Sequence, residues 1–362
     1  MSRTITRPGP GPEQRTAAAE ADAIMEQALR DEGPATPKWV RPVGDRELRF
    51  QRRMSVLVTV APLVGVALAV VWLWGNGVGT LDVVLMGGFY VLTILGVTVG
   101  FHRLFTHRSF EVPRGIRAFL AVAGTMAIEG GPIEWSATHR RHHAYADAYG
   151  DPHSPHLVEK SGFAGVIRGL WHAHMGWLFE PNGTQSERWA PDLRADRTVV
   201  AVDRLAPLWV VASFVAPPVI AFALTRSWAA ALTGFLWGSL VRMFLMHHVT
   251  WSINSICHFF GRRPFQTRDE SRNNWPLCLV SFGESWHNNH HAFPTSARHG
   301  LFRGQLDPAW RFIRTLQQLR LAKNVHLPDA RAIAARRVPT RAMRAAEAKA
   351  KATTAAAQAG GP

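Results

Sequence analysis

Cysteine is nearly absent from this chain of 362 residues, which contains only Cys257 and Cys278. Two thiols cannot hold an iron–sulfur cluster and cannot form a disulfide framework. Cys257 adjoins His258, but we interpret it as a small buried side chain rather than a metal ligand. A metal in this protein must therefore be held by other side chains.

Acidic residues are also scarce: 26 Asp and Glu stand against 41 Lys and Arg, which leaves a net charge of +15. A basic chain can bind nucleic acid, but the sequence contains no nucleic-acid-binding motif and we expect no such partner. Attraction to anionic lipid headgroups explains much of the positive charge better. The first residues contain no apolar stretch, so we do not expect them to be a signal peptide.

Histidine, by contrast, is plentiful, and nine of the seventeen histidines fall in four short clusters. The cluster members, with one asparagine, are His102, His107, His139, His142, His143, Asn254, His258, His287, His290 and His291. A neutral imidazole supplies one bond to a metal such as iron, zinc or copper, and one ion accepts about four to six ligands. Nine ligands therefore indicate two metals in one site, used for redox or oxygen chemistry.

Helical spacing supports three of the clusters, because positions i, i+3 and i+4 share one face of a helix. This applies to His139 with His142 and His143, to His287 with His290 and His291, and to Asn254 with His258. His102 and His107 are five apart, about 140° around an α-helix, so we expect an unwound or kinked turn between them. Any single cluster could be a basic solvated loop; four together disfavour that alternative.

Long apolar runs predict membrane spans at about 54–74, 81–101, 205–224 and 228–246, because about twenty apolar residues cross the hydrocarbon layer. The third run contains Pro207, Pro217 and Pro218, which membrane helices tolerate when neighbours satisfy the freed carbonyls. The fourth carries Arg242, which we expect to extend towards the membrane surface. A buried core helix is the alternative for any one run, but four runs in two pairs make it unattractive.

Charge predicts the orientation of these spans. Five arginines lie between residues 41 and 53, and the central and C-terminal segments are rich in Arg and Lys. By the positive-inside rule both termini and all four histidine clusters are cytoplasmic, and the composition favours the plasma membrane. We therefore predict an all-α membrane protein with four transmembrane helices in two hairpins and a cytoplasmic helical cap that carries the histidine-rich site.

Three regions follow from this division. Residues 1–50 form an N-terminal cytoplasmic tail, partly disordered, with a helical composition at 16–30. Residues 51–325 form the membrane domain. Residues 326–362 form an Ala/Lys/Arg-rich tail, which we interpret as a solvated helix or a disordered segment.

The order H-x-x-x-x-H, H-x-x-H-H, H-x-x-H-H, with E-W-S-A-T-H-R-R-H-H, D-P-H-S-P, N-S-I-C-H-F-F-G and H-N-N-H-H-A-F-P around it, resembles the membrane fatty-acyl desaturases, specifically the acyl-CoA delta-9 (stearoyl-CoA) type. The resemblance covers most of residues 52–319. It implies that the nine histidines hold two iron ions, with Asn254 contributing directly or through water. It also implies O2 as co-substrate and a cis-monounsaturated product.

The same resemblance suggests substrate-binding residues. The broken apolar segment 116–135 and Thr250–Trp251 correspond to the lining of the family's acyl tunnel, so Glu129 and Trp135 are candidates there. An interfacial anchor is the alternative role for Trp135. Animal acyl-CoA desaturases carry basic residues where this chain has Ala137 and Glu180-Pro181. The coenzyme A phosphates would then be held by other groups, or the acyl carrier differs; the basic candidates are Arg140, Arg141, Arg168 and Arg188.

Electrons must come from outside this sequence, which contains no haem-binding segment and no G-x-G-x-x-G nucleotide loop. We expect a separate NAD(P)H-dependent reductase, an acidic protein steered by the basic cytoplasmic face. Two alternatives remain. Histidine-box membrane enzymes also hydroxylate fatty acids or alkanes, and a membrane metal-binding protein would place ligands along its spans.

Overall fold

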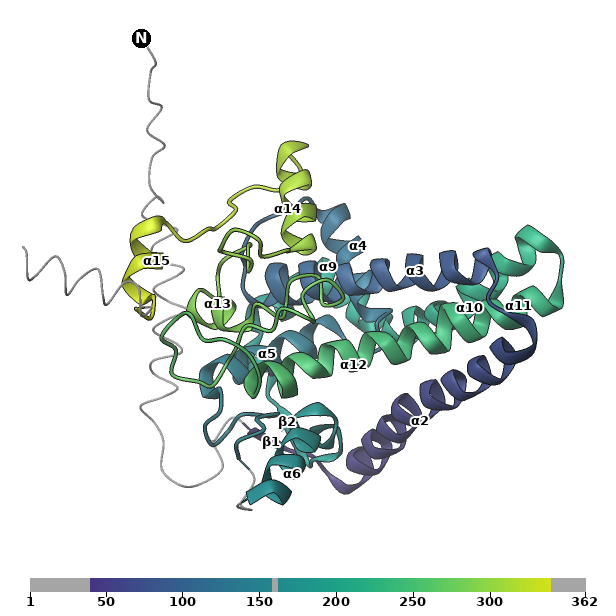
Figure 1. Ribbon diagram of the computed structural model, residues 1–362, viewed down its shortest axis with the longest axis horizontal. Coiled ribbons are helices and arrows are strands. Elements are labelled where there is room, and N and C mark those ends of the chain that lie inside the picture. Colours follow the sequence, from purple (N-terminus) through teal and green to yellow (C-terminus); the bar gives the residue numbers. More distant parts are fainter. Residues whose placement is uncertain (1–39, 158–161, 340–362) are drawn as a thin grey trace, which may run out of the picture.

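The computed structural model describes residues 40–157 and 162–339 and consists mainly of helices (Figure 1). Four long apolar helices lie on one side of the molecule, and shorter helices gather at one end of them. The long helices are α2 (Asp45–Asn76), α3 (Thr80–Leu95) continued by the π-helix η1 (Gly96–Thr106), α10 (Ala206–Thr225), and α11 (Trp228–Gly234) continued by the π-helix η3 (Phe235–Val241), α12 (Arg242–Ser255) and the 3-10 turn η4 (Ile256–His258). The predicted all-α fold with four candidate membrane helices is confirmed.

The cap is built from short elements between and after the long helices. They are α4 (Arg114–Thr125), α5 (Pro132–Tyr145), α6 (Gly162–His174), η2 (Gly176–Phe179), α7 (Ser186–Trp189), α8 (Pro191–Ala195), α9 (Arg197–Arg204), α13 (His287–Ala292), α14 (Pro308–Gln318) and α15 (Ala330–Arg336). One small antiparallel sheet pairs β1 (Val40–Pro42) with β2 (Asn182–Thr184). This sheet attaches the chain before α2 to the segment after α6.

Two of the long helices extend beyond the predicted spans at the cap end. The second continues to Thr106 and the fourth to His258, as uninterrupted helical segments of 27 and 31 residues. The additional turns carry His102, Asn254 and His258. Ligand-bearing turns are thus direct continuations of membrane helices, so the cap has a fixed position relative to the bilayer.

The core of the cap lies where η1, α4 and α5 meet. Gly96 of η1 packs backbone against backbone on Gly124 of α4, since a Cβ at Gly96 would lie 2.1 Å from the Gly124 nitrogen. Phe101 and Phe105 of η1 and Leu120 of α4 are fully buried beside this contact. The close approach of the two helices fixes the histidine-bearing end of η1 in the cap.

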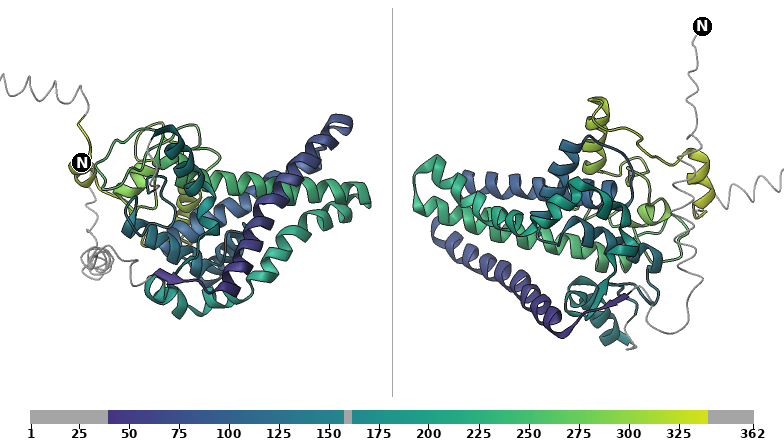
Figure 2. Two further views of the ribbon diagram at one scale, coloured as in Figure 1. Left: turned by 90° about the horizontal axis from the view of Figure 1, so that it is seen from below. Right: turned by 180° about the vertical axis from the view of Figure 1, so that it is seen from behind.

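Helix α2 runs obliquely to the other three long helices (Figure 2). It crosses η3 at Gly65, where an added Cβ would lie 2.4 Å from Leu240 Cβ, and its other contacts are with α12 and η2. Towards the cap α2 diverges, and an apolar cavity of about 1480 Å³ lies between it, α3, α5 and α12.

Side chains of the neighbouring helix bond to the carbonyls that the proline pair in α10 leaves without helical donors. Pro217 and Pro218 have no N–H, so the carbonyls of Ser213 and Phe214 lose their usual helical donors. Arg242 Nη2 lies 3.4 Å from the Ser213 carbonyl oxygen and 2.6 Å from Ser213 Oγ. The Ser239 hydroxyl donates to the Phe214 carbonyl at 2.9 Å.

The expected extension of Arg242 to the membrane surface is therefore wrong. Its side chain is fully buried between α4, α10 and α12, and it also donates to the Met126 carbonyl at 3.3 Å. A guanidinium carries five donors, which allows one side chain to satisfy carbonyls on several helices. The Arg242 side chain therefore donates to the freed carbonyls inside the helix bundle instead of extending to the water.

The C-terminal part of the described chain is attached to the cap. Gln266 N donates to Arg336 O at 2.9 Å and Val338 N to Pro264 O at 2.8 Å, while the Arg336 guanidinium lies over the Phe293 ring. The domain boundary at residue 325 remains a prediction, with residues up to Val338 bonded to the domain. The helix expected at 16–30 and most of the two tails lie outside the described residues.

Replacing Ser239 by Ala should destabilise the membrane bundle by about 1–2 kcal/mol, because the Phe214 carbonyl would be left buried without a donor. Thermal unfolding in detergent measures the change. The matched control is Ser252→Ala in the same helix, whose hydroxyl donates to the His248 carbonyl of its own helix and should matter little. Equal effects of the two variants would contradict the repair of α10 by Ser239.

Candidate metal centre

The first pair of histidines is brought together by a π-helix. In η1 the His107 N–H donates to the His102 carbonyl at 3.1 Å, an i→i+5 bond that places residue i+5 over residue i. The two rings lie 4.8 Å apart between centroids. As expected, the backbone between His102 and His107 departs from the regular α-helix. The expected unwound or kinked turn is wrong, however, because the backbone stays helical with a wider turn.

The nine clustered histidines converge at one place and divide into two sets. The five-histidine set consists of His102, His107, His139, His143 and His290, and the four-histidine set consists of His142, His258, His287 and His291. Within each set one ring nitrogen of every residue lies within 4.8 Å of those of the others. A group of this kind has the size and chemistry of a metal-binding site, so the sequence-based prediction of two metals finds two sets of ligands.

Two of the sequence clusters contribute to both sets. His139 and His143 of α5 belong to the five-histidine set, and His142 between them belongs to the other. In α13, His290 belongs to the first set and His287 and His291 to the second. The two sets are therefore neighbours: the His143 and His291 rings lie 4.5 Å apart.

The nitrogen spacing fits metal coordination. Metal–imidazole bonds are about 2.1 Å long, so two ligands at right angles have nitrogens about 3 Å apart. The Nε2 atoms of His102 and His290 are separated by 3.0 Å, and those of His143 and His290 by 2.9 Å. In the second set the Nε2 separations of His287 are 2.9 Å to His258 and 3.1 Å to His291. Such convergence of lone pairs is what a cation would hold together.

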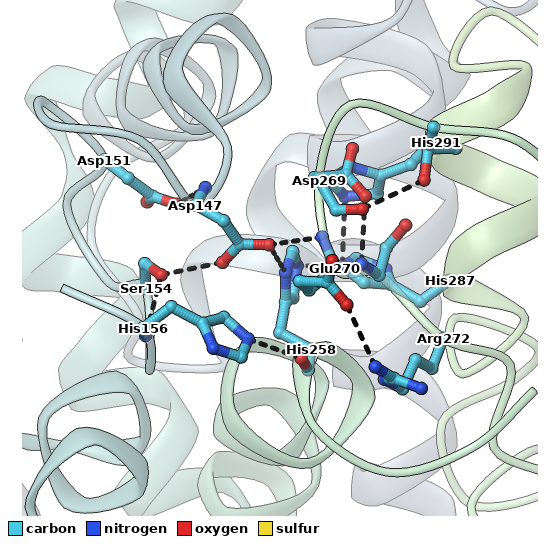
Figure 3. Close-up of polar contacts among 12 residues, drawn as sticks. Asp147, Asp151, Ser154, His156, His258, Asp269, Glu270, Arg272, His287 and His291 are labelled. Atoms are coloured by element: carbon cyan, nitrogen blue, oxygen red, sulfur yellow. Dashed lines mark hydrogen bonds and ion pairs between the residues drawn. The ribbon is translucent and has the colours of Figure 1, made fainter. Parts of the chain in front are cut away.

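Carboxylates orient four of these rings from behind. His102 Nδ1 lies 2.5 Å from Glu284, His142 Nδ1 2.9 Å from Asp151, His258 Nδ1 2.8 Å from Asp147, and His291 Nδ1 2.8 Å from Asp269. Figure 3 shows the aspartates around His258 and His291. When Nδ1–H donates to a carboxylate, the Nε2 lone pair is left for a metal, and the ring cannot rotate away.

Burial sets the protonation of the rings that lack such a partner. It is the main cause that lowers the pKa of His107, His139, His143, His287 and His290 well below the usual value, and neighbouring histidines lower it further. Burial alone would raise the pKa of the Asp269 carboxyl, but the charge and hydrogen bond of His291 lower it. Neutral imidazoles beside ionised aspartates are the state that binds a cation.

Sequence reasoning missed the carboxylates and two further histidines. His153 and His299 are buried; the His153 ring lies 4.4 Å from that of His142, and the His299 ring 4.5 Å from that of His290. His299 Nδ1 also approaches Glu284 at 3.4 Å. The D-P-H-S-P motif contains Asp151 and His153, so part of the signal was visible, but no spacing connects Glu284 or Asp269 to its histidine.

The cavity reaches the metal centre. His102, His139 and His287 line it, together with Asn254. Of the predicted substrate residues, Glu129, Trp135, Thr250, Trp251 and Arg168 line the same cavity, as do Arg141 and His172.

Two of the predicted basic residues lie elsewhere. Arg140 binds both oxygens of Asp192, at 2.6 and 3.0 Å, and the Phe105 and Thr106 carbonyls. Arg188 belongs to α7 and is not among the residues that line the cavity. The structure thus brings Arg168 and Arg141 to the cavity, but not Arg140 or Arg188.

Glu129 is held in the cavity wall by a rigid turn. Ile128 before it has φ +64°, an unfavourable conformation for a β-branched residue, and His247 Nε2 bonds the Ala127 carbonyl at 2.9 Å. Trp135 Nε1 donates to Glu129 Oε2 at 3.1 Å, and the Trp135 ring stacks on His139 at 5.0 Å. Burial raises the pKa of Glu129 to about 7. A carboxyl that is partly protonated near pH 7 thus binds Trp135, which in turn stacks on His139.

These features define a membrane protein with a multi-histidine metal-binding centre at the end of an apolar cavity. The family model described as fatty acid desaturase matches residues 78–320. The chain belongs to the fatty acid desaturase family, whose members are oxidoreductases acting on acyl chains.

Curated relatives include proteins with different acyl carriers. The hex-5-enoyl-[acyl-carrier protein] acetylenase of Moorena producens is 39% identical over 80% of this chain and 90% of its own length. The sn-1 stearoyl-lipid 9-desaturase of Anabaena variabilis is 37% identical over 74% of this chain and 85% of its own length. The acyl-CoA C20 Delta5-desaturase of Anemone leveillei is 37% identical over 67% of this chain and 72% of its own length.

Replacing His287 by Ala should remove about half of the bound metal, because the four-histidine set would keep only three nitrogen ligands. Metal per chain, measured by mass spectrometry of the purified protein, tests this expectation. His326→Ala, outside both sets, is the control and should keep the full content. Unchanged metal in the His287 variant would remove that residue from the centre.

Glu129 should make stability depend on pH. Its pKa of about 7 in the folded protein lies above the ordinary value of 4.5, so its contribution is full below about pH 4.5 and is lost as the pH rises through 7. Between pH 5 and 8 the melting temperature of the wild type should fall relative to that of Glu129→Gln. The control Glu47→Gln, at an exposed carboxyl paired with Arg41, should not reproduce this difference; parallel curves for Glu129→Gln would refute the expectation.

Proposed function

We propose that this protein catalyses the O2-dependent desaturation of a long-chain saturated fatty acyl thioester to a cis-monounsaturated acyl chain. The substrate we favour is an acyl-CoA, desaturated at the delta-9 position, with electrons from a separate NAD(P)H-dependent reductase. The observation that carries this proposal is the convergence of nine histidines, in two sets, at the end of an apolar cavity.

Two iron ions held by the two sets would supply, with O2, the oxidising power to remove one hydrogen from each of two neighbouring methylene groups. The protein's own task is geometric. Glu284 and the three aspartates fix the rings, and the strained turn at Ile128 fixes the cavity wall beside them. Catalysis of this kind requires the acyl carbons to be placed to within about an ångström.

The cavity suits a long hydrocarbon chain. Its volume of about 1480 Å³ exceeds the roughly 300–1000 Å³ of ordinary small-ligand pockets. Met54 and Val58 of α2, and Ile94 and Val97 of α3, contribute apolar walls along it. Trp135, stacked on His139, closes the wall next to the metal ligands. A methylene chain has no polar group to satisfy, so an apolar wall ending at the histidines matches it.

The charged residues that line the cavity favour a second candidate, an acyl group carried on a membrane lipid. Arg41 and Arg168 line the cavity, but Glu47, Glu134 and Glu180 line it too, and Arg41 is paired with Glu47 at 2.6 Å. Such a balance of charge offers little to the phosphates of coenzyme A. The names of the relatives include acyl-lipid, acyl-CoA and acyl-carrier-protein substrates. All three acyl carriers therefore occur among the relatives, and the choice between them needs a direct test.

We also propose a membrane topology and an electron donor for this protein. The five arginines between residues 41 and 53, just before α2 and in its first turns, support a cytoplasmic position for both termini and for the metal centre, in the plasma membrane. The net charge of +15 supports an acidic electron donor. Membership of the desaturase family argues against the metal-carrier alternative, and the hydroxylase alternative predicts a different product.

Expression with a compatible reductase should produce a new cis-monoene from stearate or palmitate, seen by gas chromatography–mass spectrometry with the double bond located. His142→Ala should abolish this product, because it removes a ligand oriented by Asp151, whereas His326→Ala should retain it. A hydroxylated product would select the hydroxylase alternative.

With the purified protein, a compatible reductase, NAD(P)H and O2, stearoyl-CoA and phospholipid vesicles containing stearate are supplied separately. Product from stearoyl-CoA alone supports the favoured carrier. Product from vesicles alone transfers the proposal to the lipid-bound substrate.

A further inference from the structure

The two histidine sets differ in the number of carboxylates that bind their rings at Nδ1. In the four-histidine set three of four rings, those of His142, His258 and His291, meet an aspartate within 2.9 Å. In the five-histidine set the described residues provide one such partner, Glu284 at His102. Three carboxylates therefore lie behind one metal position and one behind the other.

The single carboxylate of the five-histidine set is also paired with a cation. Arg103 Nη2 lies 3.0 Å from Glu284 Oε1, and the Arg103 side chain is fully buried. The same guanidinium pairs with Asp307 at 3.0 Å. One guanidinium is therefore shared by two carboxylates, so this group keeps at most one net negative charge near His102.

Among the described residues the three aspartates have no ion-paired Arg or Lys, although the buried Arg141 lies close enough to Asp151 for their charges to interact. Asp147 accepts from the Ser154 hydroxyl at 2.7 Å and from the Glu270 N–H at 2.7 Å. Asp151 accepts from the backbone N–H groups of Asp147 and His153, and Asp269 from that of Ser271. Within the described residues no Arg or Lys side chain forms an ion pair with any of the three.

The nearby arginines are paired elsewhere. Arg263 and Arg272 both bind Glu270, at 2.8 and 2.9 Å, and Figure 3 shows the Arg272 contact pointing away from Asp147. The carboxylates of Asp147, Asp151 and Asp269 are thus full negative charges, each transmitted through a hydrogen-bonded imidazole.

We infer that these three aspartates make the two metal positions unequal, so that the first electron removed from a reduced two-iron centre leaves the ion of the four-histidine set. This inference rests on the proposed di-iron function. Negative charge stabilises an ion of charge +3 more than one of +2, and a carboxylate behind an imidazole makes it a stronger donor. The fifth ring of the other set is a neutral ligand, whose effect is smaller than that of three full charges.

The step is a simple electron transfer. With ferricyanide as the oxidant, one Fe²⁺ becomes Fe³⁺ and ferricyanide becomes ferrocyanide, with no bond made or broken. Removing the charge of one aspartate should therefore make this first oxidation harder without moving the ring, because an Asn side-chain oxygen still accepts the Nδ1–H.

The experiment is an anaerobic ferricyanide titration of the reduced, iron-loaded protein, followed by Mössbauer and electron paramagnetic resonance spectroscopy. The wild type should give a half-oxidised form with one ferric ion. In Asp147→Asn, Asp151→Asn and Asp269→Asn the equilibrium constant of the first step should fall about tenfold or more. In Glu284→Gln the second step should move and the first should not.

Glu270→Gln is the matched control, because Glu270 lies near His258 in Figure 3 and, among the described residues, its carboxylate pairs with Arg263 and Arg272 rather than with a histidine; neither step should move. The inference is overturned if Glu284→Gln shifts the first step and the aspartate variants do not, or if both ions oxidise together. Iron content and acyl product are measured on the same preparations. If the protein binds two irons and forms the normal product, but the ion of the five-histidine set is oxidised first, only this inference is refuted. A protein that binds no iron refutes the proposed function as well.

Discussion

The hydrogen bond from a histidine Nδ1 to a buried carboxylate is the interaction on which the rest of this structure depends. Nine imidazoles cannot converge unless something fixes which nitrogen faces inward, and four carboxylates do this for four of them. These acids lie in irregular segments after α5 and before α13. The irregular segments are consequently well bonded themselves, as in the paired exchange between Arg262 and Asn273, because a mobile loop could not orient a ligand.

The membrane part serves the same geometry. Because η1 and η4 are direct continuations of membrane helices, His102 and His258 cannot change their depth relative to the bilayer without moving a whole span. The cavity follows from the same arrangement, since α2 touches the bundle at Gly65 and diverges towards the cap. The cap end of α2 is nevertheless attached to η2, where Gln51 and Ser55 donate to the Leu178 carbonyl, so both sides of the cavity are held in place.

The sequence predicted the parts of this structure that single side chains determine. Imidazole chemistry identified all nine histidines of the two sets, and hydropathy identified the four long helices. It did not predict how His142 separates from His139 and His143, because that depends on which histidines of the other segments each ring of this helix face meets. The Asp147–His258 pair, 111 residues apart, has no local signal. Arg242 was placed wrongly because snorkelling considers one helix, whereas its partners are carbonyls on two other segments.

The repair of α10 bears on how the protein is made. During synthesis α10 precedes the helix that supplies Ser239 and Arg242, so the carbonyls of Ser213 and Phe214 have no donor until that later segment has been translated. Because an unsatisfied carbonyl is costly in lipid, the third span is stable in the bilayer only together with the fourth. The second hairpin, rather than the single helix, is therefore the smallest part of the chain in which these two carbonyls have their donors.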